Sequence, residues 1–78
     1  MFLGWYDPDR KKPARQKLAE AVQRYSEKFG RAPQMCLTSE ADAADLVPAT
    51  KRHPDPLPVT VEPRRYIARW TFYVGDAA

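Results

Sequence analysis

The pattern of apolar and polar residues predicts strands in three parts of the chain, one from a short apolar run and two from alternation. Residues 2–6 are apolar and aromatic and end at an Asp-Pro pair, so we expect a short strand closed by a turn. Residues 57–62 alternate over a shorter stretch, and Pro58 places this strand near a sheet edge. Residues 66–74 alternate over the longest stretch and are predicted to form the last strand.

A spacing of three and four residues predicts the main helix. Pro13 suits the first helical turn, where its missing N–H is no loss, and Gly30 supplies the left-handed residue that ends many helices. We therefore expect a helix over about residues 13–29. Its apolar face is formed by Leu18, Val22, Tyr25 and Phe29, extended by Ala14 and Ala21.

A strand and a shorter helix are predicted in the middle of the chain. Residues 34–38 contain the continuous apolar run Met-Cys-Leu, which predicts a central strand that is buried on both faces. Ser39 has the chemistry of a helix N-cap, and two acids follow it in the first turn, where the helix dipole favours anions. A second helix is expected over about residues 40–46.

The elements follow in the order β-α-β-α-β-β. The first two strands are joined by a helix, so they are expected to run parallel with a right-handed crossover. The last two are close in sequence, so they are expected to pair as an antiparallel hairpin with Pro63 and Arg64 in its turn. We expect residues 1–78 to form a single small α/β domain, bordering on α+β, in which the helices pack on a mixed four-stranded sheet.

Composition and charge narrow the class of protein. The 78 residues are 44% hydrophobic and 29% charged, which is ordinary for a folded protein, and no run approaches the ~18 apolar residues of a membrane span. The formal net charge of +3 is divided unevenly: residues 32–48 carry three acids and no base, whereas both flanks are basic. Such a bipolar surface suits a charged partner or a second copy of the chain.

Cysteine and histidine usage gives little sign of catalysis. Cys36 is the only cysteine, which excludes an intrachain disulfide and a structural zinc site and favours a reduced, cytoplasmic location. Its place in an apolar strand predicts an inert thiol. His53 is the only histidine, lies in a proline-rich loop and has no visible nucleophile beside it. We expect no cofactor and no bound metal.

Arginines and aromatic residues are interleaved in the predicted hairpin. Alternation places Tyr66, Trp70 and Phe72 on one face of the last strand, and Arg69 and Tyr73 on the other. Aromatic residues and arginine are enriched at protein interfaces. The last strand is also long enough to pair edge to edge with another chain. The candidate binding residues are Arg64, Arg65, Arg69 and Tyr73, with Lys51 and Arg52 near the same edge.

The leading hypothesis is a non-enzymatic module that binds a protein partner, or itself as a homodimer, through this hairpin. The alternative is a small nucleic-acid-binding domain, in which the same arginines contact phosphate and Tyr73 stacks on a base. A second basic cluster would suit either partner and consists of Arg10, Lys11, Lys12, Arg15 and Lys17.

A metal-dependent enzyme is the third hypothesis. Asp7 and Asp9 follow the first strand, and ligands gather at the carboxyl ends of parallel strands. Two carboxylates there could hold Mg²⁺. The simpler interpretation is that both residues start turns by accepting hydrogen bonds from nearby backbone.

Overall fold

The protein, described here from a computed structural model, is defined over residues 1–46 and 57–76. Its elements are β1 (Phe2–Tyr6), α1 (Ala14–Phe29), β2 (Met35–Thr38), α2 (Glu40–Leu46), β3 (Thr60–Pro63) and β4 (Thr71–Gly75). The predicted α/β fold class and the element order β-α-β-α-β-β are confirmed. In the described part of the chain, no helix has both the length and the apolar character needed to cross a bilayer.

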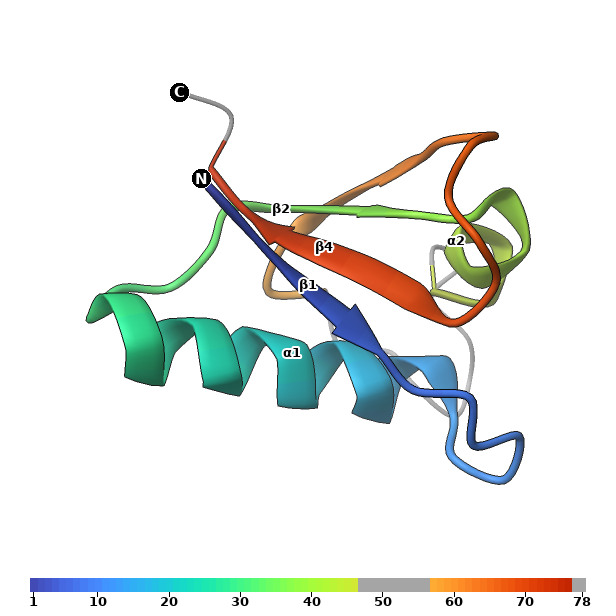
Figure 1. Cartoon of the computed structure of the whole chain (residues 1–78), viewed down its shortest axis with the longest axis horizontal. Coiled ribbons are helices and arrows are strands. Elements are labelled where there is room, and N and C mark those ends of the chain that lie inside the picture. The colour runs from blue at the N-terminus through green and yellow to red at the C-terminus, as the bar shows by residue number, and fades with distance from the viewer. Residues whose placement is uncertain (47–56, 77–78) are drawn as a thin grey trace.

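The four strands form one mixed sheet in the order β1-β4-β2-β3 (Figure 1). β4 is antiparallel to both β1 and β2, and β3 is parallel to β2. β1 and β2 therefore run parallel, as predicted, although β4 lies between them. The predicted edge position of the third strand is also confirmed, because β3 closes one side of the sheet.

The predicted C-terminal hairpin is wrong, because β3 and β4 both pair with β2 and not with each other. Residues 64–70 carry the chain past the end of β2, where the amide of Arg64 donates a hydrogen bond to the carbonyl of Thr38 at 2.8 Å. This bond holds the connection across β2 and delivers β4 to its far side. The last strand is therefore interior, so edge-to-edge pairing through it is wrong as well.

The last strand is shorter than predicted. Trp70 has a φ of 65°, a left-handed conformation that bulky residues rarely adopt, and it interrupts the alternation. Residues before it form a turn, and regular pairing begins at Thr71. The prediction that Tyr66 shares a face with Phe72 is wrong, because Tyr66 is 79% exposed whereas Phe72 is buried. Ile67, predicted on the opposite face, is also buried.

Three helix boundaries, the start and end of α1 and the start of α2, follow the sequence signals. Pro13 is the N-cap of α1, and Gly30 ends the helix with a φ of 73° and an amide that donates to the Ser26 carbonyl at 2.9 Å. Ser39 caps α2, because its Oγ accepts a hydrogen bond from the amide of Asp42 at 3.1 Å.

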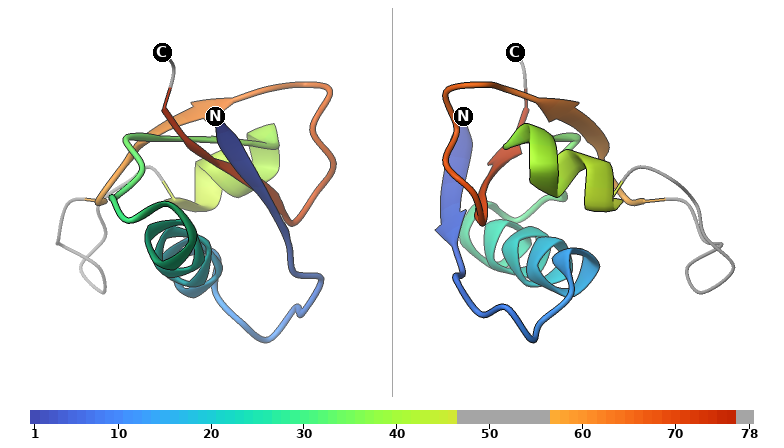
Figure 2. Two further views of the ribbon diagram at one scale, coloured as in Figure 1. Left: turned by 60° about the vertical axis from the view of Figure 1, so that its left-hand side comes forward. Right: turned by 90° about the vertical axis from the view of Figure 1, so that its right-hand side faces the viewer.

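Both helices pack on one face of the sheet, and in residues 1–46 and 57–76 no helix covers the other face (Figure 2). The first helix also contacts the second. Side chains from both helices and from the interior strands form one core; its fully buried members include Leu18, Ala21, Tyr25, Cys36, Leu46, Phe72 and Val74.

Candidate functional site

The uncovered face of the sheet carries large apolar side chains. Alternation along each strand places these residues opposite the buried Cys36, Phe72 and Val74. Exposure is 64% for Tyr6 and 40% for Tyr73. We call this surface the open face; it consists of Phe2, Gly4 and Tyr6 of β1, Met35 and Leu37 of β2, and Tyr73 of β4, with Tyr66 beside them.

The centre of the open face is a ring lying on a glycine. Gly4 and Tyr73 are paired across β1 and β4, and a Cβ placed on Gly4 would lie 3.1 Å from Cε1 of Tyr73. The missing side chain lets the ring lie close to the neighbouring strand. Tyr73 therefore lies close against β1 and stays 40% exposed in the middle of the face.

A shallow apolar hollow of about 210 Å³ opens beside this ring. Ile67, only 7% exposed, belongs to the connection that crosses β2. Tyr66 stands next to it and projects into solvent. The face thus presents a hollow and a protruding ring side by side; the hollow is lined by Phe2, Leu37, Tyr66, Ile67 and Tyr73.

The arginines of the crossing connection lie in ion pairs. Arg64 contacts Glu62 at 3.2 Å, and both side chains are partly exposed. Arg65 is almost fully exposed and lies 3.8 Å from Glu40. Positive and negative charges therefore alternate here, and no stretch of one sign forms.

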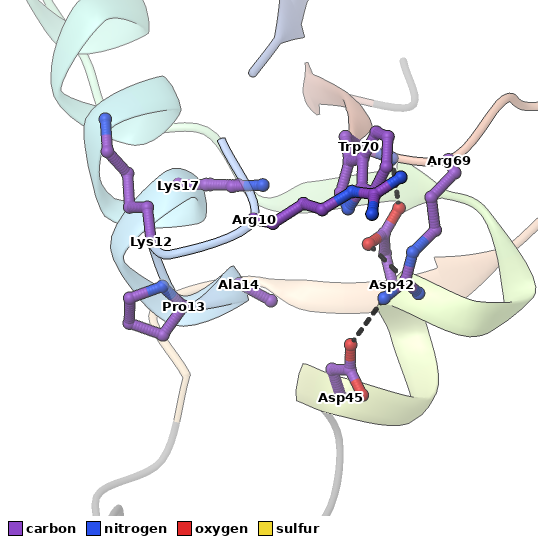
Figure 3. Close-up of a pocket in the computed structure, with 9 residues that line it drawn as sticks. All are labelled: Arg10, Lys12, Pro13, Ala14, Lys17, Asp42, Asp45, Arg69 and Trp70. Carbon is purple, nitrogen blue, oxygen red and sulfur yellow. Dashed lines mark hydrogen bonds and ion pairs between the residues drawn. The ribbon is translucent and has the colours of Figure 1, made fainter. Parts of the chain in front are cut away.

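Arg69 does not share a surface with Tyr73. Its guanidinium turns to the helix side, where it lies 3.3 Å from Asp42 and 3.1 Å from Asp45 (Figure 3). The interruption at Trp70 redirects this side chain, because the regular alternation that predicted its direction ends there. The predicted candidate residues are thus divided between two surfaces.

Asp42 organises the second surface. Its carboxylate is 1% exposed and accepts hydrogen bonds from the Ser39 hydroxyl at 2.7 Å and from the Trp70 amide at 2.6 Å. The same carboxylate also pairs with the guanidinium of Arg69, so it joins the start of α2 to the turn at residues 69 and 70. Burying this charge is tolerable because it is fully paired.

The basic cluster at the start of α1 divides in two. Lys12 contacts Asp7 at 2.9 Å and Glu20 at 3.0 Å. These bonds raise the pKa of Lys12, and the Lys12 ammonium holds the pKa of Asp7 below its ordinary value. Arg10 and Lys17 instead lie over the ring of Trp70, at 5.6 and 5.4 Å from its centroid. Lys11 is exposed, and Arg15 is partly buried on α1.

Asp7 and Asp9 act as turn residues. Asp7 accepts a hydrogen bond from the amide of Asp9 at 3.0 Å, and Asp9 accepts one from the amide of Lys11 at 2.9 Å. Across residues 1–46 and 57–76, no cluster of three or more carboxylate, imidazole or thiol groups is placed to hold a metal ion.

Cys36 lies in the core. Burial, reinforced by the charge of Asp42, raises the pKa of its thiol to about 12, so the reactive thiolate is disfavoured at neutral pH. The remaining candidates, Lys51, Arg52 and His53, lie outside the described residues.

The sequence did not predict the positions of two residues on these surfaces, Leu37 and Lys17. Leu37 appeared as part of a strand buried on both faces, and only the absence of a helix on one side exposes it to the open face. Lys17 appeared as one member of a basic cluster. Its spacing, three residues after Ala14 and four before Ala21, places it on the apolar face of α1 and was the available signal.

Comparison with known proteins returned no matching family model, no matching curated protein and no matching solved structure.

Proposed function

We propose that this protein is a non-enzymatic interaction module whose open face binds a second copy of the same chain. The observation that carries the proposal is the sheet face that no described helix covers, because α1 and α2 share the opposite side. Large exposed apolar patches on a small folded protein mark interaction sites. Aromatic residues dominate this one, as they do in the energetic centres of protein interfaces.

A second copy is favoured over an unrelated protein by the shape of the face. Its hollow and the protruding Tyr66 lie side by side, so a twofold axis lets each copy insert a ring into the other. Glu62 and Arg64 stand together on the crossing side of the face. The same twofold arrangement sets each of these charges near its opposite on the partner.

Nucleic acid is the second candidate, supported by the exposed rings of Tyr66 and Tyr73. The charges around these two rings argue against nucleic-acid binding. Arg64 and Arg65 are each beside a glutamate, and Arg69 is bound on the other side of the molecule. A phosphate backbone needs cations that are free to replace its counterions, so this arrangement favours a protein partner.

Size-exclusion chromatography with light scattering tests the proposal at high micromolar concentration. We expect a dimer mass for the wild type and for Tyr66→Phe, which keeps the ring, and a monomer mass for Tyr66→Ser. A wild type that stays monomeric, or a dimer unaffected by Tyr66→Ser, overturns self-association through this face. Fluorescence anisotropy with single-stranded oligonucleotides at low salt tests the second candidate; binding lost in Tyr73→Ser would replace the protein partner with nucleic acid.

A further inference from the structure

We propose that the cavity between the start of α1 and the Arg69–Trp70 turn binds a phosphate dianion, either free or as a phosphomonoester. The cavity has a volume of about 160 Å³, against about 30 Å³ for one water in the liquid. It lies on the helix side of the molecule and does not depend on the open face (Figure 3).

Lys17 is the residue that points to a ligand. Its side chain is 2% exposed, and Figure 3 shows its ammonium directed from α1 toward Arg10 and Trp70. Among the residues that the structure describes, no carboxylate lies within ion-pair distance of this ammonium. The charge of Lys17 also acts on the carboxylate of Asp7, but that carboxylate is bonded to Lys12. A buried cation normally has a paired anion, and Lys17 has none in direct contact among the described residues, so we infer that a bound anion would pair with it.

Arg10 supplies the second cation. Its guanidinium lies 5.6 Å from the Trp70 ring centroid, and within the described ranges no acid forms an ion pair with it. Both cations lie over the Trp70 ring, as does the guanidinium of Arg69 at 5.9 Å, and cation–π attraction keeps them beside the cavity. A guanidinium and an ammonium converging on one space form the usual donor set for phosphate.

The neighbouring carboxylates are already engaged. Asp42 and Asp45 line the same cavity but share the guanidinium of Arg69, and Asp7 is bound by Lys12. Within the described residues, Arg10 and Lys17 are the basic side chains of this lining that form no ion pair with a carboxylate, and a phosphate monoester, whose second pKa is about 6, is the anion that we place opposite them. An anion is therefore placed on the Lys17 side of the cavity, away from Asp45.

The first turn of α1 adds to the positive charge beside the cavity. Pro13 and Ala14 line the cavity, and the helix begins with no side-chain cap and no acid in its first turn. Helices usually place acids there, because their N-termini carry a partial positive charge. Omitting them leaves that charge for a bound anion.

An NMR titration of the intact chain with inorganic phosphate at pH 7.5 tests the proposal. We expect saturable shifts of the Trp70 indole and of the Lys17 and Arg10 resonances. Lys17→Met and Arg10→Met should each weaken binding by about tenfold or more, the usual effect of losing one charged hydrogen bond. Lys11→Met removes one exposed charge close by and should leave the affinity within about twofold.

Further arms distinguish the sources of the phosphate group. A small phosphomonoester that binds like inorganic phosphate supports the proposal, as does an oligonucleotide that binds here only when it carries a terminal phosphate. Binding only by phosphodiesters overturns the dianion assignment. The proposal also fails if no ligand gives saturable shifts at tens of millimolar, or if Arg10→Met, an exposed and fold-neutral change, and Lys17→Met both bind as the wild type does.

Discussion

The backbone amide of Trp70 donates a hydrogen bond of 2.6 Å to the buried carboxylate of Asp42, and this bond ties the turn before β4 to α2. Trp70 has a φ of 65°, a conformation that costs a bulky residue about 1–3 kcal/mol. A hydrogen bond to a charged group contributes about 1.5–3 kcal/mol, enough to offset that cost. The pair therefore holds Arg69 and the Trp70 ring against the cavity.

Replacing Asp42 is expected to destabilise the fold strongly. Asp42→Ala leaves the Trp70 amide and the Ser39 hydroxyl without their acceptor, so we expect a loss of about 3 kcal/mol in the free energy of unfolding. Urea denaturation measures it. Asp45→Ala is the matched control, because it removes the exposed partner of Arg69 and should cost less than about 1 kcal/mol. Equal losses for the two variants would contradict this role of Asp42.

Substitution of Gly75 is predicted to destabilise the sheet more than substitution of Gly4. A Cβ at Gly75 would lie 2.0 Å from the carbonyl oxygen of Met1, so Gly75→Ala must displace the start of β1. We expect a loss of about 2–4 kcal/mol. Gly4→Ala meets only the exposed ring of Tyr73 and should cost about 1 kcal/mol or less. Thermal unfolding compares the two, and the opposite ranking would show that β1 does not pair with β4 in this register.

Lys17 is expected to lower the free energy of unfolding and to contribute to phosphate binding. Lys17→Met keeps the length of the side chain and removes a buried charge that lacks a carboxylate partner among the described residues, so the free energy of unfolding should rise by about 1 kcal/mol or more. Denaturation in phosphate-free buffer measures this gain. Phosphate should then stabilise the wild type and not the variant. A variant that is less stable than the wild type in phosphate-free buffer would mean that Lys17 already has a stabilising partner.

The thiol of Cys36 is predicted to be unreactive. It is also predicted to make the free energy of unfolding fall as the pH rises in the alkaline range. Its pKa rises from 9.0 to about 12 on folding, so the native state binds more protons than the unfolded state between these values. The stabilisation is fully present below pH 9 and is lost as the pH rises, by about 1.4 kcal/mol per pH unit. Cys36→Ala should lack this slope.

A thiol reagent at pH 8 gives the simpler measurement for Cys36. The wild type should react only after denaturant is added, because the thiol is buried in the core. Rapid labelling of the native protein would place Cys36 at the surface and contradict its burial in the core.

Local signals predicted most of the fold. Pro13, Gly30 and Ser39 marked helix boundaries that the structure confirms, because caps depend on nearby residues alone. The pairing of β3 and β4 was not predictable in the same way. Chain proximity favoured a hairpin, whereas the outcome depends on β2 binding both strands, a long-range choice that no short segment encodes.

The candidate surfaces were predicted in part. Tyr73 was expected on the outer face of the last strand, and it lies on the open face. Arg69 was expected beside it, and the left-handed Trp70 turned it to the other side of the sheet. Alternation predicts side-chain direction only along regular strand backbone. Because the backbone is irregular at Trp70, alternation does not predict the faces of the residues before it.

We propose above that the open face binds a second copy of the chain. A dilution series followed by NMR tests this self-association most directly. We predict that resonances of Phe2, Leu37, Tyr66 and Tyr73 shift with concentration, whereas those of Gln23 and Glu27 on the exposed side of α1 do not. Tyr66→Ser should abolish the shifts and Tyr66→Phe should keep them. Concentration-independent spectra, or shifts confined to the helix side, would contradict the account.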